Sequence, residues 1–346
     1  MTGLPMIQAE GVKKSFGKTH ALAGIDIAVE PGTVLAVLGR NGAGKTTFVR
    51  ILSTLLAPDA GQVRIAGVDV VRDARTVRSM IGLAGQFAAV DEMLSGRENL
   101  ELVGRLYGLS KREARERASE VLERLGLTDA GDRLVRTYSG GMRRRLDLGA
   151  SLAGRPLVLI MDEPSTGLDP RSRLELWGLI DDFVKAGTTM LLTTQYLEEA
   201  DRLADRVAVI ERGRLIAAGT ADELKQRIGG DVLEVRATRS SDIDRLVTVL
   251  RGLSGAQPVA DLHSQSVTLP TTERVATLIA AARLIDDSGI PVADIGIRRP
   301  SLDDVFLTLT ATGQPVRRGA QAAPTLRAVG NERLVDGRRN GKRASL

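Results

Sequence analysis

A glycine-rich octapeptide near the N-terminus combines a permissive backbone with one amine and one hydroxyl. Residues 39–46 read Gly-Arg-Asn-Gly-Ala-Gly-Lys-Thr and fit the pattern G-x-x-x-x-G-K-[ST] at every position. Its glycines let backbone N–H groups converge on phosphate oxygens, because no Cβ stands in the way. In this pattern Lys45 reaches the β- and γ-phosphates, and the Thr46 hydroxyl binds Mg²⁺. The sequence therefore predicts a bound nucleoside triphosphate.

The segments on either side of this loop predict the elements that hold it. Val34–Leu38 is a short apolar run typical of a buried strand, and a helical pattern extends from Lys45 to Leu56. A loop between a strand and a helix presents the free N–H groups of the helix start, and the positive end of its dipole, to an anion. This context favours a phosphate-binding loop over a glycine-rich turn without a ligand.

A second apolar run ends in two carboxylates, since Leu157–Met161 is followed by Asp162 and Glu163. One carboxylate at a strand end suffices to hold Mg²⁺, directly or through water, and we assign that role to Asp162. Glu163 is then placed to polarise the water that attacks the γ-phosphate. An ordinary strand end capped by a helix is the alternative, and Lys45 upstream favours the catalytic interpretation.

Two weaker signals lie between these segments. Gln86 follows a strand-like stretch, Met80–Ala84, and a neutral amide there is suited to bind Mg²⁺ and sense the γ-phosphate. Ser139-Gly140-Gly141 precedes a helical stretch from Arg143 to Leu152. Such a turn at a helix start binds anions in some proteins and is only a cap in others. In a chain with the Lys45 loop, the anion-binding interpretation gains weight.

Taken in order, these residues resemble the motifs of the ATP-binding cassette (ABC) ATPases. The matches are Gly39–Thr46 for the Walker A loop, Gln86 for the Q-loop, Tyr138–Met142 for the LSGGQ signature, Leu157–Glu163 for Walker B, and Ser165–Asp169 for the D-loop. Phe16 stands where the family stacks an aromatic ring on adenine. The resemblance covers about residues 6–222.

The resemblance implies ATP and Mg²⁺ as cofactors and three sets of site residues. It assigns catalysis to Glu163, Gln195 and Lys45, and Mg²⁺ to Thr46, Gln86 and Asp162. The residues expected to hold the nucleotide are Phe16, Gly39, Arg40, Asn41, Gly42, Ala43, Gly44, Lys45, Thr46, Thr47, Gln86, Ser139, Gly140 and Gly141.

Three segments are similar to the daunorubicin/doxorubicin-resistance branch of drug-exporter ATPases, namely Tyr138–Asp147, Thr193–Asp201 and Ser301–Leu307. Members of this branch are cytoplasmic subunits paired with a separate multi-span permease. The resemblance thus implies a peripheral subunit on the cytoplasmic face of the membrane, hydrolysing ATP to power efflux of a drug or other hydrophobic small molecule. It also implies a head-to-tail homodimer, in which Ser139 and Gly141 of one copy close over the γ-phosphate held by the other. The segment Met93–Leu109 is expected to receive the permease.

Some positions depart from the general ABC pattern. Tyr138 and Met142 replace Leu and Gln of the signature, but both flank the Ser-Gly-Gly core, so we expect its phosphate contact to survive. Gln195 stands where most ABC ATPases carry a switch histidine. Glutamine can donate a hydrogen bond, but it carries no charge and shuttles no proton. We therefore expect Glu163 to bear more of the water activation and turnover to be slow.

Composition and periodicity bound the architecture. The 346 residues, 43% of them hydrophobic, suffice for two or three domains, and the absence of cysteine excludes disulfides and thiolate metal sites. We expect no signal peptide and no membrane span, since apolar runs fall far short of ~18 residues. Alternating apolar runs and helical patterns predict an α/β fold of the ABC P-loop type, with a mostly parallel sheet, an antiparallel β subdomain and a helical insertion. The expected divisions are an ATPase domain at 1–230 with its helical part at about 86–150, a small α+β domain at 231–312, and a tail at 313–346.

The charge distribution bears on the partners. Residues 314–346 hold eight basic and two acidic residues, so the net charge of that segment is +6. Because the whole chain has a net charge of +5, residues 1–313 carry −1. The tail is predicted to be a disordered, solvated segment, with contact to anionic lipid headgroups as the alternative. A body without basic excess disfavours a soluble ABC ATPase acting on nucleic acid, and intact Lys45, Asp162 and Glu163 disfavour a non-hydrolysing sensor. An exporter of lipid or polysaccharide stays open. His20 and His263 lie outside every motif and are expected to be ordinary residues.

Overall fold

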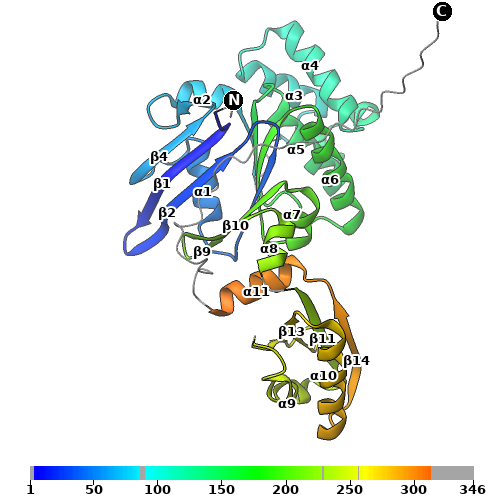
Figure 1. Cartoon of the computed structure of the whole chain (residues 1–346). Helices are drawn as coiled ribbons and strands as arrows, with labels where there is room; N and C mark the ends of the chain where they lie inside the picture. The colour runs from blue at the N-terminus through cyan, green and yellow to red at the C-terminus, as the bar shows by residue number, and fades with distance from the viewer. Residues whose placement is uncertain (1–3, 86–89, 228–229, 256, 313–346) are drawn as a thin grey trace, which may run out of the picture.

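A six-stranded sheet forms the centre of the N-terminal two-thirds of the chain (Figure 1). The structure is a computed structural model and describes residues 4–85, 90–227, 230–255 and 257–312. The strand order is β10-β9-β3-β8-β7-β6, and all neighbours are parallel except β9 and β10. The strands are β3 (Val34–Leu38), β6 (Ile81–Ala84), β7 (Val158–Asp162), β8 (Thr189–Thr194), β9 (Arg206–Glu211) and β10 (Arg214–Gly219). The predicted mostly parallel sheet is confirmed.

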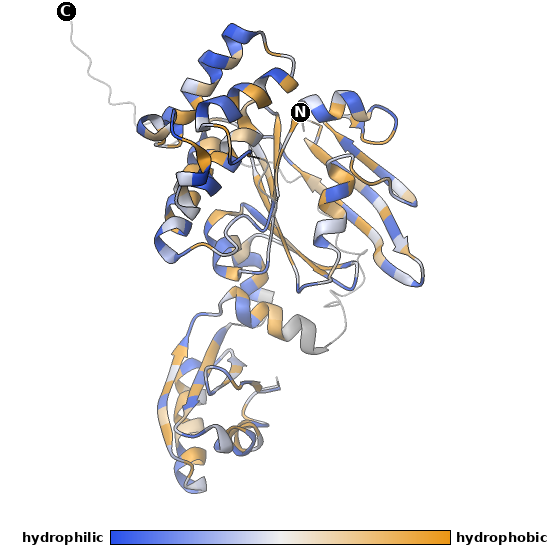
Figure 2. Cartoon of the chain, turned by 180° about the vertical axis from the view of Figure 1, so that it is seen from behind, coloured by the Kyte–Doolittle hydropathy of each residue, from blue (hydrophilic) through white to orange (hydrophobic). Residues whose placement is uncertain are grey.

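The two faces of this sheet are covered by different elements, and the alternation of side chains along β3 shows the division. Leu35 and Val37 belong to one hydrophobic cluster, whereas Ala36 and Leu38 belong to another. Because both faces are buried, β3, β7 and β8 are buried along their whole length, which explains their continuous apolar sequences. Figure 2 shows the apolar residues concentrated on these central strands.

A four-stranded antiparallel sheet and α1 (Lys45–Leu52) cover one face. The order of this sheet is β2-β1-β4-β5, formed by β1 (Ile7–Phe16), β2 (Thr19–Val29), β4 (Ala60–Ile65) and β5 (Val68–Asp69). Apolar residues of β1, β2 and β4 pack with those of α1 and of the central sheet in one cluster. The short helix α2 (Ala74–Met80) then leads into β6. The predicted antiparallel β subdomain is present.

Helices cover the other face. They are α3 (Gly96–Leu106), α4 (Lys111–Arg124), α5 (Gly140–Leu152), α6 (Pro170–Lys185), α7 (Leu197–Leu203) and α8 (Ala221–Arg227), with short 3-10 turns at Thr128–Ala130 and Val135–Thr137. α4 begins with a capping box, in which the side chain and backbone of Ser110 exchange hydrogen bonds with Glu113. Leu122 and Leu146 join this helical part to the same cluster as the central strands.

The C-terminal part contains a third sheet with its own hydrophobic cluster. The order is β12-β13-β11-β14, formed by β11 (Asp231–Ala237), β12 (Val259–Asp261), β13 (Ser266–Thr271) and β14 (Val292–Arg298). A 3-10 turn at Ser240–Asp242 precedes α9 (Ile243–Leu250), and α10 (Arg274–Ser288) follows β13. Leu233, Leu246 and Ile285 show that both helices pack on this sheet.

The last helix, α11 (Leu302–Thr312), belongs to a different environment from the sheet before it. Its residues Leu302 and Val305 lie in the hydrophobic cluster of the N-terminal part, and α11 contacts α7 and α8. The chain therefore forms a small sheet of its own and then returns to the N-terminal part (Figure 1). None of the helices in the described ranges is both long and apolar enough to cross a membrane.

Candidate nucleotide-binding and hydrolysis site

The glycine-rich loop joins β3 to α1, and its shape depends on glycine at several positions. Gly42 and Gly44 have φ of +80° and +111°, in the left-handed region where glycine is favoured. A Cβ on Gly44 would lie 2.5 Å from the backbone oxygen of Ala21, and one on Gly39 would lie 2.5 Å from that of Ile210. No side chain caps the start of α1, which leaves its first N–H groups to a ligand. α1 ends at Leu52 rather than at the expected Leu56, because Thr54 adopts a φ of +62°.

The amine of Lys45 is buried within this loop. Its Nζ donates to the backbone oxygens of Gly39 at 2.7 Å and Arg40 at 3.3 Å, and it lies 3.3 Å from Oε1 of Glu163. The side chains of Lys45 and Glu163 are 4% and 9% exposed. The loop from β3 and the strand end of β7 therefore meet at one ammonium group.

Asp162 and Glu163 stand side by side at the end of β7, and Thr193 of β8 organises both. The Thr193 hydroxyl donates to Oδ1 of Asp162. The backbone N–H of Glu163 donates to the oxygen of Thr193 at 3.0 Å and to its Oγ1 at 3.2 Å. Glu163 has a φ of +50°, so the chain turns sharply immediately after Asp162. The motif segment Thr193–Asp201 contains Thr193 without assigning it a role, although its place at a strand end beside Gln195 was a usable signal.

Other predicted nucleotide contacts lie on the surface near the loop. Arg40, Asn41 and Thr46 are exposed, and Thr47 is half-buried. Phe16 is 51% exposed at the end of β1, and the amine of Lys14 lies 5.8 Å from its ring centroid. An exposed aromatic ring of this kind is free to stack on a base.

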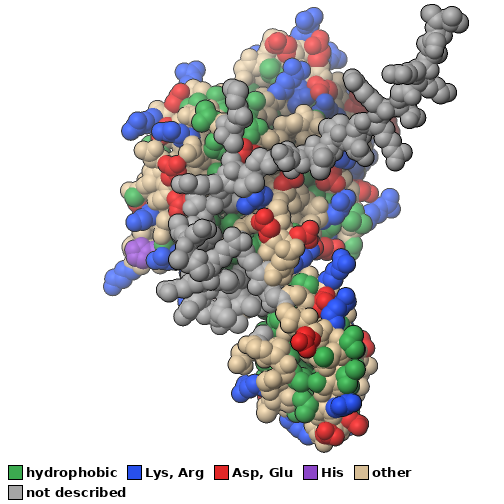
Figure 3. Space-filling view, viewed as in Figure 1, with side chains coloured by type: hydrophobic (Ala, Val, Ile, Leu, Met, Phe, Trp, Pro, Cys, Tyr) green, Lys and Arg blue, Asp and Glu red, His purple; other side chains and the backbone are tan. Residues whose placement is uncertain are grey.

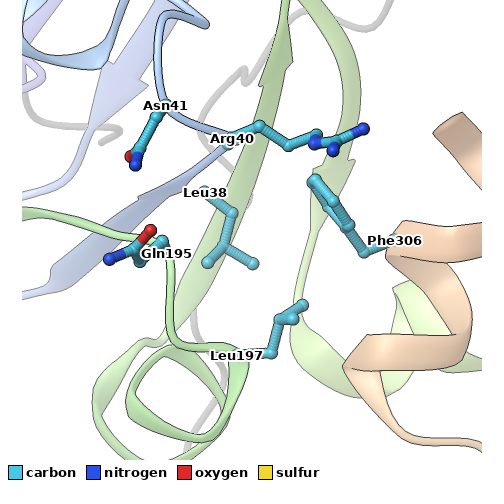
Figure 4. Close-up of a pocket in the computed structure, with 7 residues that line it drawn as sticks. Leu38, Arg40, Asn41, Gln195, Leu197 and Phe306 are labelled. Carbon is cyan, nitrogen blue, oxygen red and sulfur yellow. The ribbon is translucent and has the colours of Figure 1, made fainter. Parts of the chain in front are cut away.

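Gln195 follows β8 and is exposed beside a pocket of about 350 Å³. The pocket is lined by Leu38, Gly39, Arg40, Asn41, Gln195, Leu197 and Phe306. Figure 4 shows Phe306 reaching in from α11 toward Arg40, with Gln195 and Asn41 on the opposite side. Phe306 belongs to the motif segment Ser301–Leu307, but nothing in that motif predicts its place beside the glycine-rich loop.

Ser139 caps α5, its Oγ accepting from the backbone N–H of Met142 at 3.2 Å. α5 begins at Gly140 rather than at the predicted Arg143, so both glycines lie in its first turn. Ser139 and Gly140 are exposed, and a Cβ on Gly141 would lie 2.8 Å from Oγ of Ser172. Tyr138 is buried and donates to the backbone oxygen of Ala130 at 2.7 Å, which makes it an anchor. Gln86 lies outside the described residues, and its predicted role stays a prediction.

Known proteins with similar sequences and structures define the class. The family model for ABC transporters matches residues 22–166. The daunorubicin resistance ATP-binding protein DrrA2 of Streptomyces coeruleorubidus is 56% identical over 304 residues, which cover 88% of this chain and 94% of that protein. The doxorubicin resistance ATP-binding protein DrrA of Mycobacterium tuberculosis is 50% identical over 308 residues, 88% of this chain and 93% of that protein. The solved structure of cbiO1 from Clostridium perfringens, part of an ABC transporter complex, superposes with a TM-score of 0.60 at 27% identity, over 65% of this chain and 94% of that one.

The fold, the site and these similarities define an ABC-type ATPase. It binds ATP and couples ATP hydrolysis to transport. Within that class, the chain belongs to the family of daunorubicin/doxorubicin-resistance ATP-binding proteins. The resemblance inferred from the sequence motifs is confirmed.

Proposed function

We propose that this chain powers the export of a drug or another hydrophobic small molecule through a separate membrane permease. The observation that carries the proposal is the contact of buried Lys45 with Glu163, beside Asp162, in a chain similar over most of its length to drug-resistance ATP-binding proteins. Burying charged groups costs free energy that pairing offsets only in part, so a buried ammonium group beside two carboxylates is more typical of a functional site than of an ordinary strand end.

The loop and Lys45 hold the phosphates, and Phe16 stacks on the adenine. Backbone N–H groups at the start of α1 converge on the phosphate oxygens, as the uncapped helix start permits. The phosphates offer Lys45 stronger acceptors than the carbonyls of Gly39 and Arg40, which are its present partners. When Lys45 turns to them, its contact with Glu163 weakens, and the carboxylate becomes available to a water.

The residues near Glu163 fit Mg²⁺ as the companion of the nucleotide. Asp162 is a buried carboxylate, and Thr46 exposes a hydroxyl at the helix start; both offer the hard oxygen ligands that Mg²⁺ prefers. Gln86 would add an amide oxygen. The chemistry that Mg²⁺ would supply, if these residues held it, is neutralisation of negative charge on the phosphates.

Glu163 acts as the general base and Gln195 as a neutral donor to the γ-phosphate. Thr193 fixes the backbone of Glu163 from the side of β8, which limits the directions the carboxylate can take. Since Gln195 cannot take up a proton, the whole proton transfer falls to Glu163. Because Gln195 gives no help with the proton, we expect ATP turnover to be slow.

Two copies complete each site. Ser139 and Gly140 are exposed at the start of α5, and the N–H groups of Ser139–Gly141 close over the γ-phosphate bound by the other copy. Apolar residues on the helical part are suited to the permease, since Met93 and Leu106 are 67% and 78% exposed and Leu102 is exposed as well. Docking there would hold the chain at the cytoplasmic face of the membrane. Basic and acidic side chains are interspersed on the face drawn in Figure 3, and this face does not favour nucleic acid as the partner.

The domain divisions remain part of this proposal. We take residues 1–230 as the ATPase domain, with its helical part at about 86–150, and residues 231–312 as a small α+β domain. The distinct hydrophobic cluster of β11–β14 supports the second division for the sheet and its two helices, whereas α11 packs against the ATPase domain. The tail at 313–346 lies outside the described residues.

The test is purification of the tagged full chain from membranes in mild detergent, with its partners identified by mass spectrometry. We expect a stoichiometric multi-span protein, and ATP hydrolysis by the complex that the exported compound stimulates. Recovery of ribosomes or DNA, or of no membrane protein, would overturn the proposed export function.

A further inference from the structure

Three consecutive arginines near the start of α5 have three different environments. Arg143 forms an ion pair at 2.7 Å with Glu92 on the surface. Arg145 donates to the backbone oxygen of Leu125 at 3.1 Å, at the end of α4. Arg144 turns instead toward the edge of the central sheet, and its side chain is 16% exposed.

Arg144 donates to the backbone of two loops that follow neighbouring strands. Its Nε donates to the oxygen of Pro164 at 2.7 Å and its Nη2 to that of Glu163 at 3.4 Å, both just after β7. Its Nη1 donates to the oxygen of Gly85, just after β6, at 2.8 Å. One planar guanidinium thus reaches the three carbonyls from three separate nitrogens in a fixed plane, a spread that the single nitrogen of a lysine does not reproduce.

The charge environment keeps this guanidinium in place. Burial lowers the pKa of Arg144, while the carboxylates of Asp147, Glu199 and Asp162 oppose that effect. Asp147 of α5 lies 3.4 Å from Nη1. Glu199 of α7 is buried and accepts from the indole of Trp177 at 3.0 Å. Arginine remains charged at any working pH, so these groups surround a permanent cation with anions from three elements.

We propose that Arg144 is a positioning residue that makes the orientation of Glu163 depend on the position of α5. Glu163 is held by Thr193 on one side and by Arg144 on the other, and its φ of +50° concentrates the turn at that residue. A shift of α5 would therefore move the Glu163–Pro164 peptide and the carboxylate with it. This inference rests on the proposed dimer, in which Ser139–Gly141 at the start of the same helix binds the nucleotide of the other site. Arg144 then makes hydrolysis in one site depend on engagement of the other.

The experiment compares full-length Arg144→Lys and Arg144→Gln with Arg143→Gln, a control that removes a surface ion pair on the same turn of α5. Steady-state hydrolysis, equilibrium ATP binding and thermal unfolding are measured for each. We expect kcat to fall about tenfold or more for both Arg144 variants, because a small misplacement of a catalytic group is costly. ATP affinity should stay near that of the wild type, whereas the unfolding temperature of the Arg144 variants should fall, because three carbonyls lose their donor. Turnover is therefore measured below these unfolding temperatures, and Arg143→Gln should match the wild type throughout.

A double-mutant cycle tests whether the effect passes through the helix start. If Arg144 transmits engagement of Ser139, Arg144→Lys should cost little more once Ser139→Ala is present, whereas independent effects would multiply. The inference is overturned by a wild-type kcat in Arg144→Lys, by multiplying effects, or by parallel losses of kcat and ATP affinity in the folded variants. A wild-type chain without ATP hydrolysis would overturn the proposed function and this inference together, whereas an active wild type with unaffected Arg144 variants would overturn this inference alone.

Discussion

Two cation–carboxylate contacts in this molecule differ in how completely they are formed. In the nucleotide site, Lys45 makes one contact of 3.3 Å with Glu163, and both side chains are nearly inaccessible to solvent. In the C-terminal sheet, Arg298 donates to both oxygens of Asp304 at 2.6 and 2.9 Å and also to Glu234, while remaining 37% exposed. Asp304 accepts further hydrogen bonds of 2.7 Å from the backbone N–H and the hydroxyl of Ser301.

The Lys45–Glu163 contact is suited to being exchanged for another partner, whereas the Arg298–Asp304 contact is suited to holding structural elements together. A lysine is a point charge that can move between acceptors, whereas an arginine fork matches a carboxylate with two bonds. Burial alone would raise the pKa of Asp304, but the hydrogen bonds from Arg298 and Ser301 outweigh it and lower the pKa. Arg298 thus ties β11, β14 and α11 together, and α11 brings Phe306 to the pocket beside the glycine-rich loop.

The largest effect is expected from Glu163→Gln, which replaces the carboxylate that contacts Lys45 with a neutral amide. ATP should still bind, because Lys45 and the loop are intact, and two copies should remain locked around it. Turnover should fall at least about 100-fold, as expected when a general base is lost. Phosphate release assays measure turnover, and light scattering with and without ATP measures dimerisation. Undiminished hydrolysis would remove Glu163 from its role.

Asp304→Asn tests the contact between Arg298 and Asp304. We expect the free energy of unfolding of the C-terminal part to fall by about 1–3 kcal/mol, the range for hydrogen bonds to charged groups. ATP turnover should change by less than about twofold, because no group that touches the nucleotide is altered. Hydrogen exchange in 231–312 and calorimetry measure the loss. Asp303→Asn, at the exposed neighbouring position, is the matched control, and an equal loss there would contradict the assignment to Arg298.

Gln195→His tests the nucleotide site, where a neutral amide stands in the place of a switch histidine. A histidine would add a group that takes up a proton near pH 7, relieving Glu163 of part of its task. We expect turnover to rise, by up to about tenfold, since general acid–base assistance can contribute that much. The rate of the variant should also acquire an additional pH dependence near pH 7, in the range where a histidine titrates. A lower rate with unchanged ATP affinity would show that the amide is the better partner here.

How far the sequence predicts this molecule differs between the same two regions. In the ATPase part, long buried strands produce continuous apolar runs, and motif residues stand at their ends, so β3, β7, Lys45 and the carboxylates could be anticipated. β12 and β14 were not, because they are edge strands: β12 has only three residues, and the side chains of β14 are mostly half-exposed. Alternation is weak where neither face is fully buried.

The partners of the site residues were also beyond the sequence. Thr193 meets Asp162 across a separation of 31 residues, and Arg144 meets Gly85 across 59. Periodicity predicts which face of an element is buried, but not which loop a polar side chain on that element reaches. The return of α11 to the N-terminal core was missed for the same reason, since Leu302 and Val305 are compatible with burial against either part.

The smallest effect is expected when the pH is lowered and the stabilisation by Asp304 is lost. Because the pKa of Asp304 is lowered in the folded chain, its pairing stabilises the protein at pH values above the ordinary range of an aspartate. That contribution is lost as the pH falls through the ordinary pKa toward the lowered one. Calorimetric unfolding of the wild type and of Asp304→Asn, measured from pH 7 downward, should therefore show a difference that shrinks as the solution becomes more acidic. Since arginine stays protonated throughout, the convergence reports the carboxylate alone. A difference that stays constant with pH would mean that Asp304 stabilises α11 by shape and hydrogen bonding rather than by its charge.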